Sequence, residues 1–124
     1  MAKQRKVTGP ASTSTSRHIS ERLTLALNEL RLIATPSQQA VLLEYLTQIL
    51  RWNQTYNLTA IRDPNQALIQ HIFDSLSVVT PIHRFLTGTV TTTPLIVDVG
   101  SGAGLPGVVL SVMFPEVQIK CIDA

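Results

Sequence analysis

Residues 95–107 read Leu-Ile-Val-Asp-Val-Gly-Ser-Gly-Ala-Gly-Leu-Pro-Gly, and no other run says as much about the architecture. Its first five residues predict a strand, and four glycines follow within eight residues. Apolar spacing then predicts a helix over 105–114 and a second strand over 117–123 that ends in a carboxylate, Asp123. A strand, a glycine turn, a helix and an acidic strand end form the first half of a nucleotide-type α/β site.

Two classes of ligand compete for this glycine loop. Gly102, Gly104 and Gly107 satisfy the dinucleotide pattern G-x-G-x-x-G, and Asp123 lies 21 residues after Gly102, where a ribose-binding acid is expected. However, Asp98 would repel the pyrophosphate of NAD or FAD at short range. Asp98 would instead attract S-adenosylmethionine, because the sulfonium and α-amino groups of this cofactor are cationic. The sequence therefore favours S-adenosylmethionine over a dinucleotide, or over a glycine turn that binds nothing.

The layout predicts an α/β protein in which a helical N-terminal cap precedes the β-α-β start of a Rossmann-like sheet. We expect a disordered, basic, Ser/Thr-rich leader at 1–17, the helical cap at 18–86, a loop at 87–94 and the sheet domain at 95–124. Two strands with one crossover cannot cover both faces of a parallel sheet. The expectation is therefore an incomplete, truncated sheet domain.

Proline signals divide the helical region. Thr35-Pro36 and Asp63-Pro64 each look like an N-cap followed by proline at the first helical position. Apolar residues at helical spacing begin at Ile19, again after Pro36, and again from Ala67, where the pattern extends toward Ile82. The sequence thus predicts at least three helices before the loop at 87–94.

Composition narrows the class of protein. The 124 residues are 44% hydrophobic and 15% charged, which suits one modest domain with a buried core. Cys121 is the single cysteine, which excludes an internal disulfide, and it is predicted to be a small core residue. The sequence contains no apolar run long enough to span a membrane and no secretory signal, so we predict a cytoplasmic protein. The basic leader either contacts nucleic acid phosphate or is simply solvated.

Polar and aromatic pairs stand out in the helical region. Asn53 and Asn57 lie four residues apart, and His71 and Asp74 three apart, so each pair can share a helix face. For His71 and Asp74 two readings stay open: a capped turn in which Asp74-Ser75 starts a helix, or a role in shaping the cofactor and substrate pocket. Trp52 and Tyr56 are also four apart and form either core or a stacking surface, with core favoured for Trp52. The three histidines lie too far apart along the chain to indicate a metal site, and no Ser/His/Asp triad is evident.

Four motifs in order make a resemblance specific. They are Trp-Asn-x-x-Tyr-Asn-Leu-Thr at 52–59, Arg-Asp-Pro at 62–64, His-x-x-Asp-Ser-Leu at 71–76, and Asp-Val-Gly-Ser-Gly-Ala-Gly-Leu-Pro-Gly at 98–107. With them the chain resembles the small-subunit ribosomal RNA guanine-N7 methyltransferase family, also called glucose-inhibited division protein B, over residues 20–124.

The resemblance implies a bacterial, cytoplasmic enzyme that transfers a methyl group from S-adenosylmethionine to N7 of a guanine in 16S rRNA. Asp98 would order the loop and face the methionine amino group, Asp123 would hold the ribose, and the remaining cofactor contacts would be Gly100, Gly102, Gly104 and Leu105. Four further residues match family motifs and are expected to order the pocket: Asn53, Asn57, His71 and Asp74. No catalytic group is assigned, because guanine N7 carries a free lone pair and needs no general base. Since members of the family continue past the second strand, the resemblance also implies that these 124 residues form an inactive fragment that binds cofactor weakly.

Two alternatives stay open from the sequence. One is a non-catalytic RNA-binding remnant that uses the helical cap and the basic leader. The other is a piece of an NAD(P)-dependent oxidoreductase, which Asp98 disfavours. The small ribosomal subunit is the expected partner, with no membrane and no metal, and the oligomeric state is left open.

Overall fold

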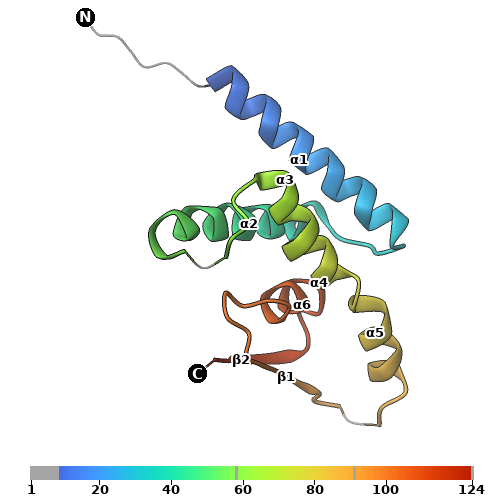
Figure 1. The fold of residues 1–124 in the computed structure, drawn as a ribbon. Helices are drawn as coiled ribbons and strands as arrows, with labels where there is room; N and C mark the ends of the chain where they lie inside the picture. Colours follow the sequence, from blue (N-terminus) through green and yellow to red (C-terminus); the bar gives the residue numbers. More distant parts are fainter. Residues whose placement is uncertain (1–8, 58, 91, 124) are drawn as a thin grey trace, which may run out of the picture.

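The computed structural model describes residues 9–57, 59–90 and 92–123. Helices come first, followed by a two-stranded sheet packed against one helix (Figure 1). The elements are α1 (Gly9–Glu29), α2 (Pro36–Tyr56), α3 (Pro64–Ala67), η1 (Leu68–Phe73), α4 (Asp74–Leu76), α5 (Val79–Thr87), β1 (Leu95–Val99), α6 (Gly107–Met113) and β2 (Gln118–Ile122). This mixed helix and parallel-strand arrangement agrees with the predicted α/β class.

Helix α1 begins earlier than the sequence indicated. Gly9–Arg17 were expected to be disordered, but they are helical, while residues 1–8 lie outside the described part of the chain. The packed part of α1 comes later, where Ile19, Leu23 and Leu27 are buried at the predicted spacing. Once that part is folded, each added residue gains a backbone hydrogen bond, so the helix extends into a Ser/Thr-rich stretch that has no apolar pattern.

Both predicted caps are confirmed. The Thr35 hydroxyl accepts a hydrogen bond from the Gln38 backbone N–H at 3.1 Å, and the Gln38 side chain accepts one from the Thr35 N–H at 2.8 Å. Asp63 likewise caps the next helix through the Gln66 N–H at 3.0 Å. These local bonds satisfy backbone donors that have no partner within the helix, and they fix where each helix begins.

The third predicted helix, which begins at Pro64, is less regular than its apolar pattern suggested. From Pro64 to Leu76 it is continuous, but its middle, η1, is a π-helical turn. It stops at Ser77–Val78, and α5 then continues the chain as a separate helix. The apolar spacing that pointed on toward Ile82 therefore spans two helices.

The two strands pair in parallel, with Asp98 opposite Cys121 and Val99 opposite Ile122. Helix α6 connects them and covers one face of the sheet (Figure 1). On the other face Leu95, Val97 and Val99 are exposed. Both strands match the predicted segments to within one residue at each end.

One hydrophobic core joins the helical region to the sheet unit. Its fully buried aliphatic side chains come from α1, α2, η1, α4 and α6: Leu23, Leu42, Leu68, Ile72, Leu76 and Val109. Gln38 adds a polar link, since its amide donates to the Val112 carbonyl at 2.9 Å. The helical cap therefore holds the glycine loop and α6 in place. In the described residues no helix is both long and apolar enough to cross a membrane.

Candidate functional site

The glycine loop leaves the carboxyl end of β1 and is tied at once to β2. The backbone N–H groups of Gly100 and Ser101 donate to the Ile122 carbonyl at 2.6 and 3.3 Å. Three of its glycines have positive φ: 77° at Gly100, 56° at Gly102 and 100° at Gly104. The loop therefore takes a backbone path that L side chains rarely adopt.

The loop has an open side and a packed side. A Cβ built on Gly100 or Gly102 meets no atom within 4 Å, so this backbone is free to be approached by a ligand. A Cβ on Gly107 would lie 2.4 Å from Cys121 Sγ and 2.9 Å from Asp98 Oδ2. Glycine is needed there because β1 and β2 press against the start of α6.

The Asp98 carboxylate joins the two ends of the glycine loop. Its Oδ2 accepts a hydrogen bond from the Gly107 backbone N–H at 2.8 Å. This bond spans the whole glycine loop, from the strand before it to the helix after it. A carboxylate is thus held at the carboxyl edge of the sheet, where ligands of open α/β sheets bind.

Tyr45 is a site residue that the sequence reasoning missed. It lies among the apolar residues of α2, and its hydroxyl donates to the Ala103 carbonyl in the glycine loop at 2.7 Å. Burial raises the pKa of Tyr45 to about 12, and the nearby Cys121 and Asp98 add to the effect. The signal was its chemistry, because a packed tyrosine hydroxyl usually finds a hydrogen-bond partner.

Asp123 and Leu105, two predicted cofactor contacts, differ in their exposure to solvent. Asp123 is exposed and directly follows Ile122, whose carbonyl binds the first two loop amides. The position of Asp123 in the chain is therefore next to the residue that holds the start of the loop. Leu105 is half-buried and packs against the core, so at least part of its side chain faces away from solvent.

Asn53 and Asn57 both stabilise the segment after α2. Asn53 is 1% exposed; its side chain accepts from the Thr59 N–H at 2.8 Å and donates to the Ile61 carbonyl at 3.2 Å. Asn57 ends α2 with a left-handed φ of 50° and accepts a hydrogen bond from Arg62. These contacts tie the two asparagines to their own segment rather than to the glycine loop.

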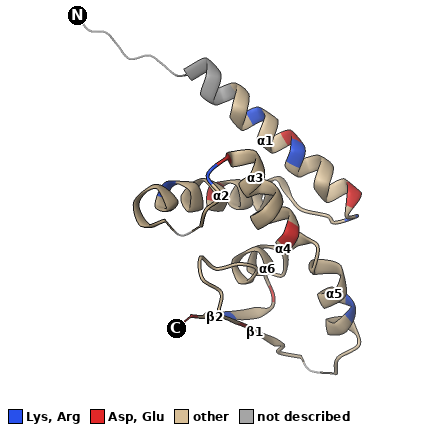
Figure 2. Cartoon of the chain, viewed as in Figure 1, with Lys and Arg blue, Asp and Glu red and all other residues tan. Residues whose placement is uncertain are grey.

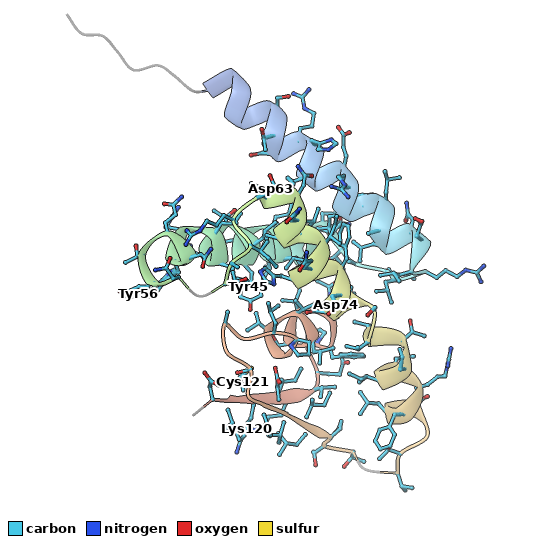
Figure 3. The ribbon with its side chains drawn as sticks, viewed as in Figure 1. Tyr45, Tyr56, Asp63, Asp74, Lys120 and Cys121 are labelled. Carbon is cyan, nitrogen blue, oxygen red and sulfur yellow. The ribbon has the colours of Figure 1, made fainter. Side chains whose placement is uncertain are left out.

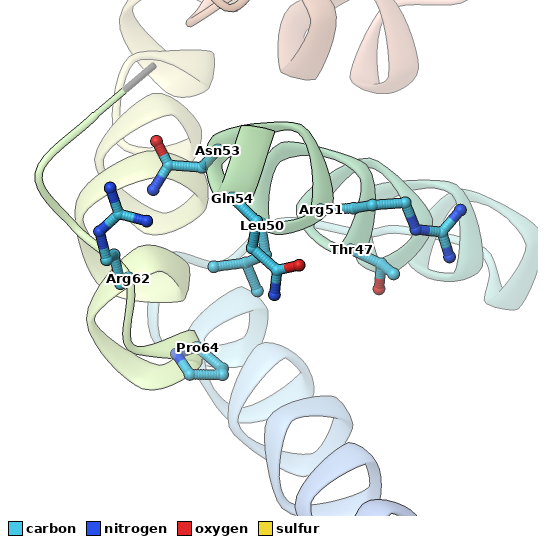
Figure 4. Close-up of a pocket in the computed structure, with 7 residues that line it drawn as sticks. All are labelled: Thr47, Leu50, Arg51, Asn53, Gln54, Arg62 and Pro64. Carbon is cyan, nitrogen blue, oxygen red and sulfur yellow. The ribbon is translucent and has the colours of Figure 1, made fainter. Parts of the chain in front are cut away.

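A hollow of about 600 Å³ opens beside this segment, between α2 and the start of α3 (Figure 4). It is lined by Thr47, Leu50, Arg51, Asn53, Gln54, Arg62 and Pro64. The sequence did not predict it, since it forms only when the segment after α2 folds back. Its charged lining residues are both arginines.

His71 lies in η1, and Asp74 begins α4. The His71 carbonyl accepts from the Ser75 hydroxyl at 2.6 Å, while its Nε2 is buried and has no hydrogen-bond partner among the described residues. Burial lowers the pKa of His71, so the neutral ring is favoured. Asp74 is exposed at the start of α4, above α6 in Figure 3. It continues a helix, so the reading of Asp74-Ser75 as a capped helix start is wrong.

Two core predictions are wrong. Cys121 is exposed, because β2 has only one neighbouring strand and leaves this edge open. Trp52 is 52% exposed and stacks on Tyr56, because the last turns of α2 extend beyond the core. Within the described ranges no group of three His, Cys, Asp or Glu side chains could hold a metal ion.

Comparisons with known proteins point to one family. The family model described as GidB, rRNA small subunit methyltransferase G, matches residues 38–124. A protein from Bordetella avium named ribosomal RNA small subunit methyltransferase G is 56% identical over 104 residues, which covers 84% of this chain and 46% of that protein. The protein of the same name from Bordetella pertussis is 53% identical over 105 residues, with the same shares covered.

A more distant relative with that name, from Albidiferax ferrireducens, is 43% identical over 114 residues, covering 86% of this chain and 51% of its own. The chain thus spans about half the length of the curated relatives it matches. No solved structure matches it significantly.

Proposed function

Because this chain belongs to the rRNA small subunit methyltransferase G family, we propose that it carries the S-adenosylmethionine site of an enzyme that methylates N7 of a guanine in 16S rRNA. The assignment confirms the family that the four motifs resembled. It also removes the class of dinucleotide-dependent oxidoreductases from consideration. The proposed substrate is found in the bacterial cytoplasm, as part of the small ribosomal subunit.

The open side of the glycine loop is the observation that carries the proposal. Gly100 and Gly102 offer bare backbone at the carboxyl edge of two parallel strands, and Asp98 supplies negative charge beside them. A cationic ligand is favoured at such a place, whereas a pyrophosphate would be repelled. These residues therefore fit the methionine end of S-adenosylmethionine.

Each residue near the loop has a proposed role in binding. Gly100 and Gly102 let the backbone approach the cofactor, and Leu105 packs under it. Gly104 is buried, and a Cβ there would lie 2.7 Å from Val108 Cγ2 and 3.1 Å from the Tyr45 hydroxyl, so its proposed role is to let the loop pack against the protein rather than to contact the cofactor. Asp98 holds the loop through Gly107 and attracts the methionine amino group. Asp123 accepts hydrogen bonds from the ribose hydroxyls. Asn53 and Asn57 shape the neighbouring pocket by fixing the segment after α2, and His71 and Asp74 keep a pocket role from their family motif alone.

S-adenosylmethionine supplies an electrophilic methyl group, and guanine N7 supplies a lone pair that carries no proton. The protein then needs to align the two and exclude water, and it needs no general base. That requirement suits a site built from backbone amides, a loop-ordering carboxylate and a tyrosine tether.

The test combines transfer and binding. A protein in which this chain is extended to the length of its relatives is incubated with methyl-labelled S-adenosylmethionine and small ribosomal subunits that lack the modification, because the 124 residues alone are expected to be inactive. The label is mapped by strand scission at N7-methylguanosine. We expect label at one guanine of 16S rRNA, and calorimetry should detect S-adenosylmethionine but not NAD. Asp98→Asn should weaken cofactor binding at least tenfold, because it keeps the shape and removes the charge. Labelling of another base, or preference for NAD, would overturn the proposal.

A further inference from the structure

Two large aromatic rings lie stacked on the surface of α2. Trp52 and Tyr56 are 52% and 60% exposed, and their ring centroids are 5.3 Å apart with planes inclined by 26°. Exposing two such rings forgoes the free energy that burial of their apolar area would give. Neither ring is buried in the hydrophobic core, so core packing does not explain why they are stacked at this position.

The pair lies on the helix face that also reaches the glycine loop. Trp52 and Tyr56 follow Tyr45 by seven and eleven residues, spacings that return to one side of a helix, about 10 and 16 Å further along its axis. Tyr45 itself donates to Ala103 of the loop. Figure 3 shows Tyr45 above the glycine loop and Tyr56 further along the same helix.

This end of α2 lies on the side of the molecule where both strands end. In Figure 1 the last turn of α2, the glycine loop and the end of β2 all lie on the left. The aromatic pair therefore lies on the same side of the molecule as the glycine loop.

The charge around the pair suits a polyanion. Between Glu44 and Asp63 the charged residues are two arginines, Arg51 and Arg62. Figure 2 shows blue positions in α2 and in the segment that follows it, with red positions close by. The Arg62 guanidinium binds Asn57, the residue directly after Tyr56, and both arginines line the hollow beside α2.

We propose that Trp52 and Tyr56 form a stacking platform for an unpaired base of the RNA substrate, with Arg51 and Arg62 binding adjacent phosphates. Protein sites for single-stranded RNA combine these same two elements, aromatic faces and guanidinium groups. The platform deepens the proposed function, because it would hold a nucleotide next to the cofactor loop. If this surface bound a protein partner instead, single-stranded and duplex RNA would not be expected to bind it differently.

Trp52 is the single tryptophan of the chain, so its fluorescence reports this surface alone. A short single-stranded RNA containing guanine is titrated into the protein, and the same sequence as a duplex serves for comparison. We expect the single strand to quench Trp52 fluorescence and the duplex to leave it nearly unchanged. Equal quenching by both, or none by the single strand, would overturn the proposal.

Variants separate stacking from folding. Trp52→Ala and Tyr56→Ala should each weaken binding of labelled single-stranded RNA by roughly fivefold or more, whereas Trp52→Phe keeps a ring and most of the affinity. Phe85→Ala is the matched control, because Phe85 is 72% exposed on α5, a different helix. Loss of affinity in Phe85→Ala as large as in Trp52→Ala would also overturn the platform.

The two proposals can fail separately. RNA-dependent quenching without methyl transfer would refute the proposed function and leave the platform standing. Methyl transfer with an unchanged KM for small ribosomal subunits in Trp52→Ala would do the reverse.

Discussion

Asp98 Oδ2 accepts a hydrogen bond from the Gly107 backbone N–H at 2.8 Å, and this one bond closes the glycine loop. Asp98 belongs to β1 and Gly107 begins α6, so the loop between them is held at both ends. Replacing Asp98 tests how much the fold depends on the closure.

Asp98→Ala should lower the free energy of unfolding by about 2–3 kcal/mol, because the Gly107 N–H loses a charged acceptor. Asp98→Asn keeps an acceptor oxygen and should cost only about 1 kcal/mol. Urea denaturation of both variants measures the difference. Equal stability of the two would mean that the hydrogen bond does not hold the loop.

Gly107→Ala should destabilise the protein by about 1–3 kcal/mol, since overpacking forces neighbours aside. The added methyl would lie 2.4 Å from Cys121 Sγ and 2.9 Å from Asp98 Oδ2, so the carboxylate must leave the Gly107 amide. Gly88→Ala is the control, because its Cβ would meet only carbonyl oxygens at ordinary distances of 3.6 and 3.7 Å. Thermal melts that show equal losses for both would contradict this reading of the loop.

Local signals explain why much of the fold could be predicted from the sequence. Thr35 and Asp63 cap the helices that follow them, and the pattern at 95–107 fixed β1 and the turn, because each signal acts within a few residues. The hydrogen bond from Gly107 to Asp98 spans nine residues, and the loop-ordering role of Asp98 was expected from the family resemblance rather than from a local pattern.

What could not be predicted depends on tertiary packing. The bond from Tyr45 to Ala103 joins residues 58 positions apart, and no local pattern encodes it. The exposure of Trp52 depends on how far α2 extends past the core. The burial of Asn53 arises only because the segment after α2 folds back over it.

Tyr45→Phe should remove the link between the helical cap and the loop at a cost of about 1 kcal/mol, the net value of one hydrogen bond. Hydrogen exchange of the Gly104 and Leu105 amides should become faster, because the loop then loses its tether to α2 and keeps only its bonds to β2 and Asp98. Tyr56→Phe is the matched control, since Tyr56 is exposed.

The raised pKa of Tyr45 gives a second readout of the same variant. Folding holds its proton up to a pKa of about 12, against an ordinary value of 10.0, so stability should fall as pH rises from 10 toward 12. In Tyr45→Phe this part of the alkaline loss should disappear. An identical alkaline profile in wild type and variant would show that Tyr45 titrates as in the unfolded chain.

Asn53→Ala should cost about 2–4 kcal/mol, because it removes two hydrogen bonds and leaves backbone groups of Thr59 and Ile61 without their partners. Gln54→Ala, an exposed neighbour on the same turn, should change stability by less than about 0.5 kcal/mol. Chemical denaturation compares the two. A small effect of Asn53→Ala would mean that the segment after α2 is held by other contacts.

His71 should make the protein acid-sensitive in a defined window. Burial lowers the pKa of His71 below the ordinary value of 6.5. Below pH 6.5 the unfolded chain therefore binds a proton at His71 more readily than the folded chain does. Stability is therefore complete above 6.5, falls as pH drops through it, and stops falling below the folded-state pKa. His71→Gln cannot titrate and should flatten this part of the stability profile, while His83→Gln, which removes an exposed ring that stacks on Phe114, should leave it in place. If wild type and His71→Gln lose stability equally between neutral and mildly acidic pH, the buried Nε2 of His71 is not the group that senses acid.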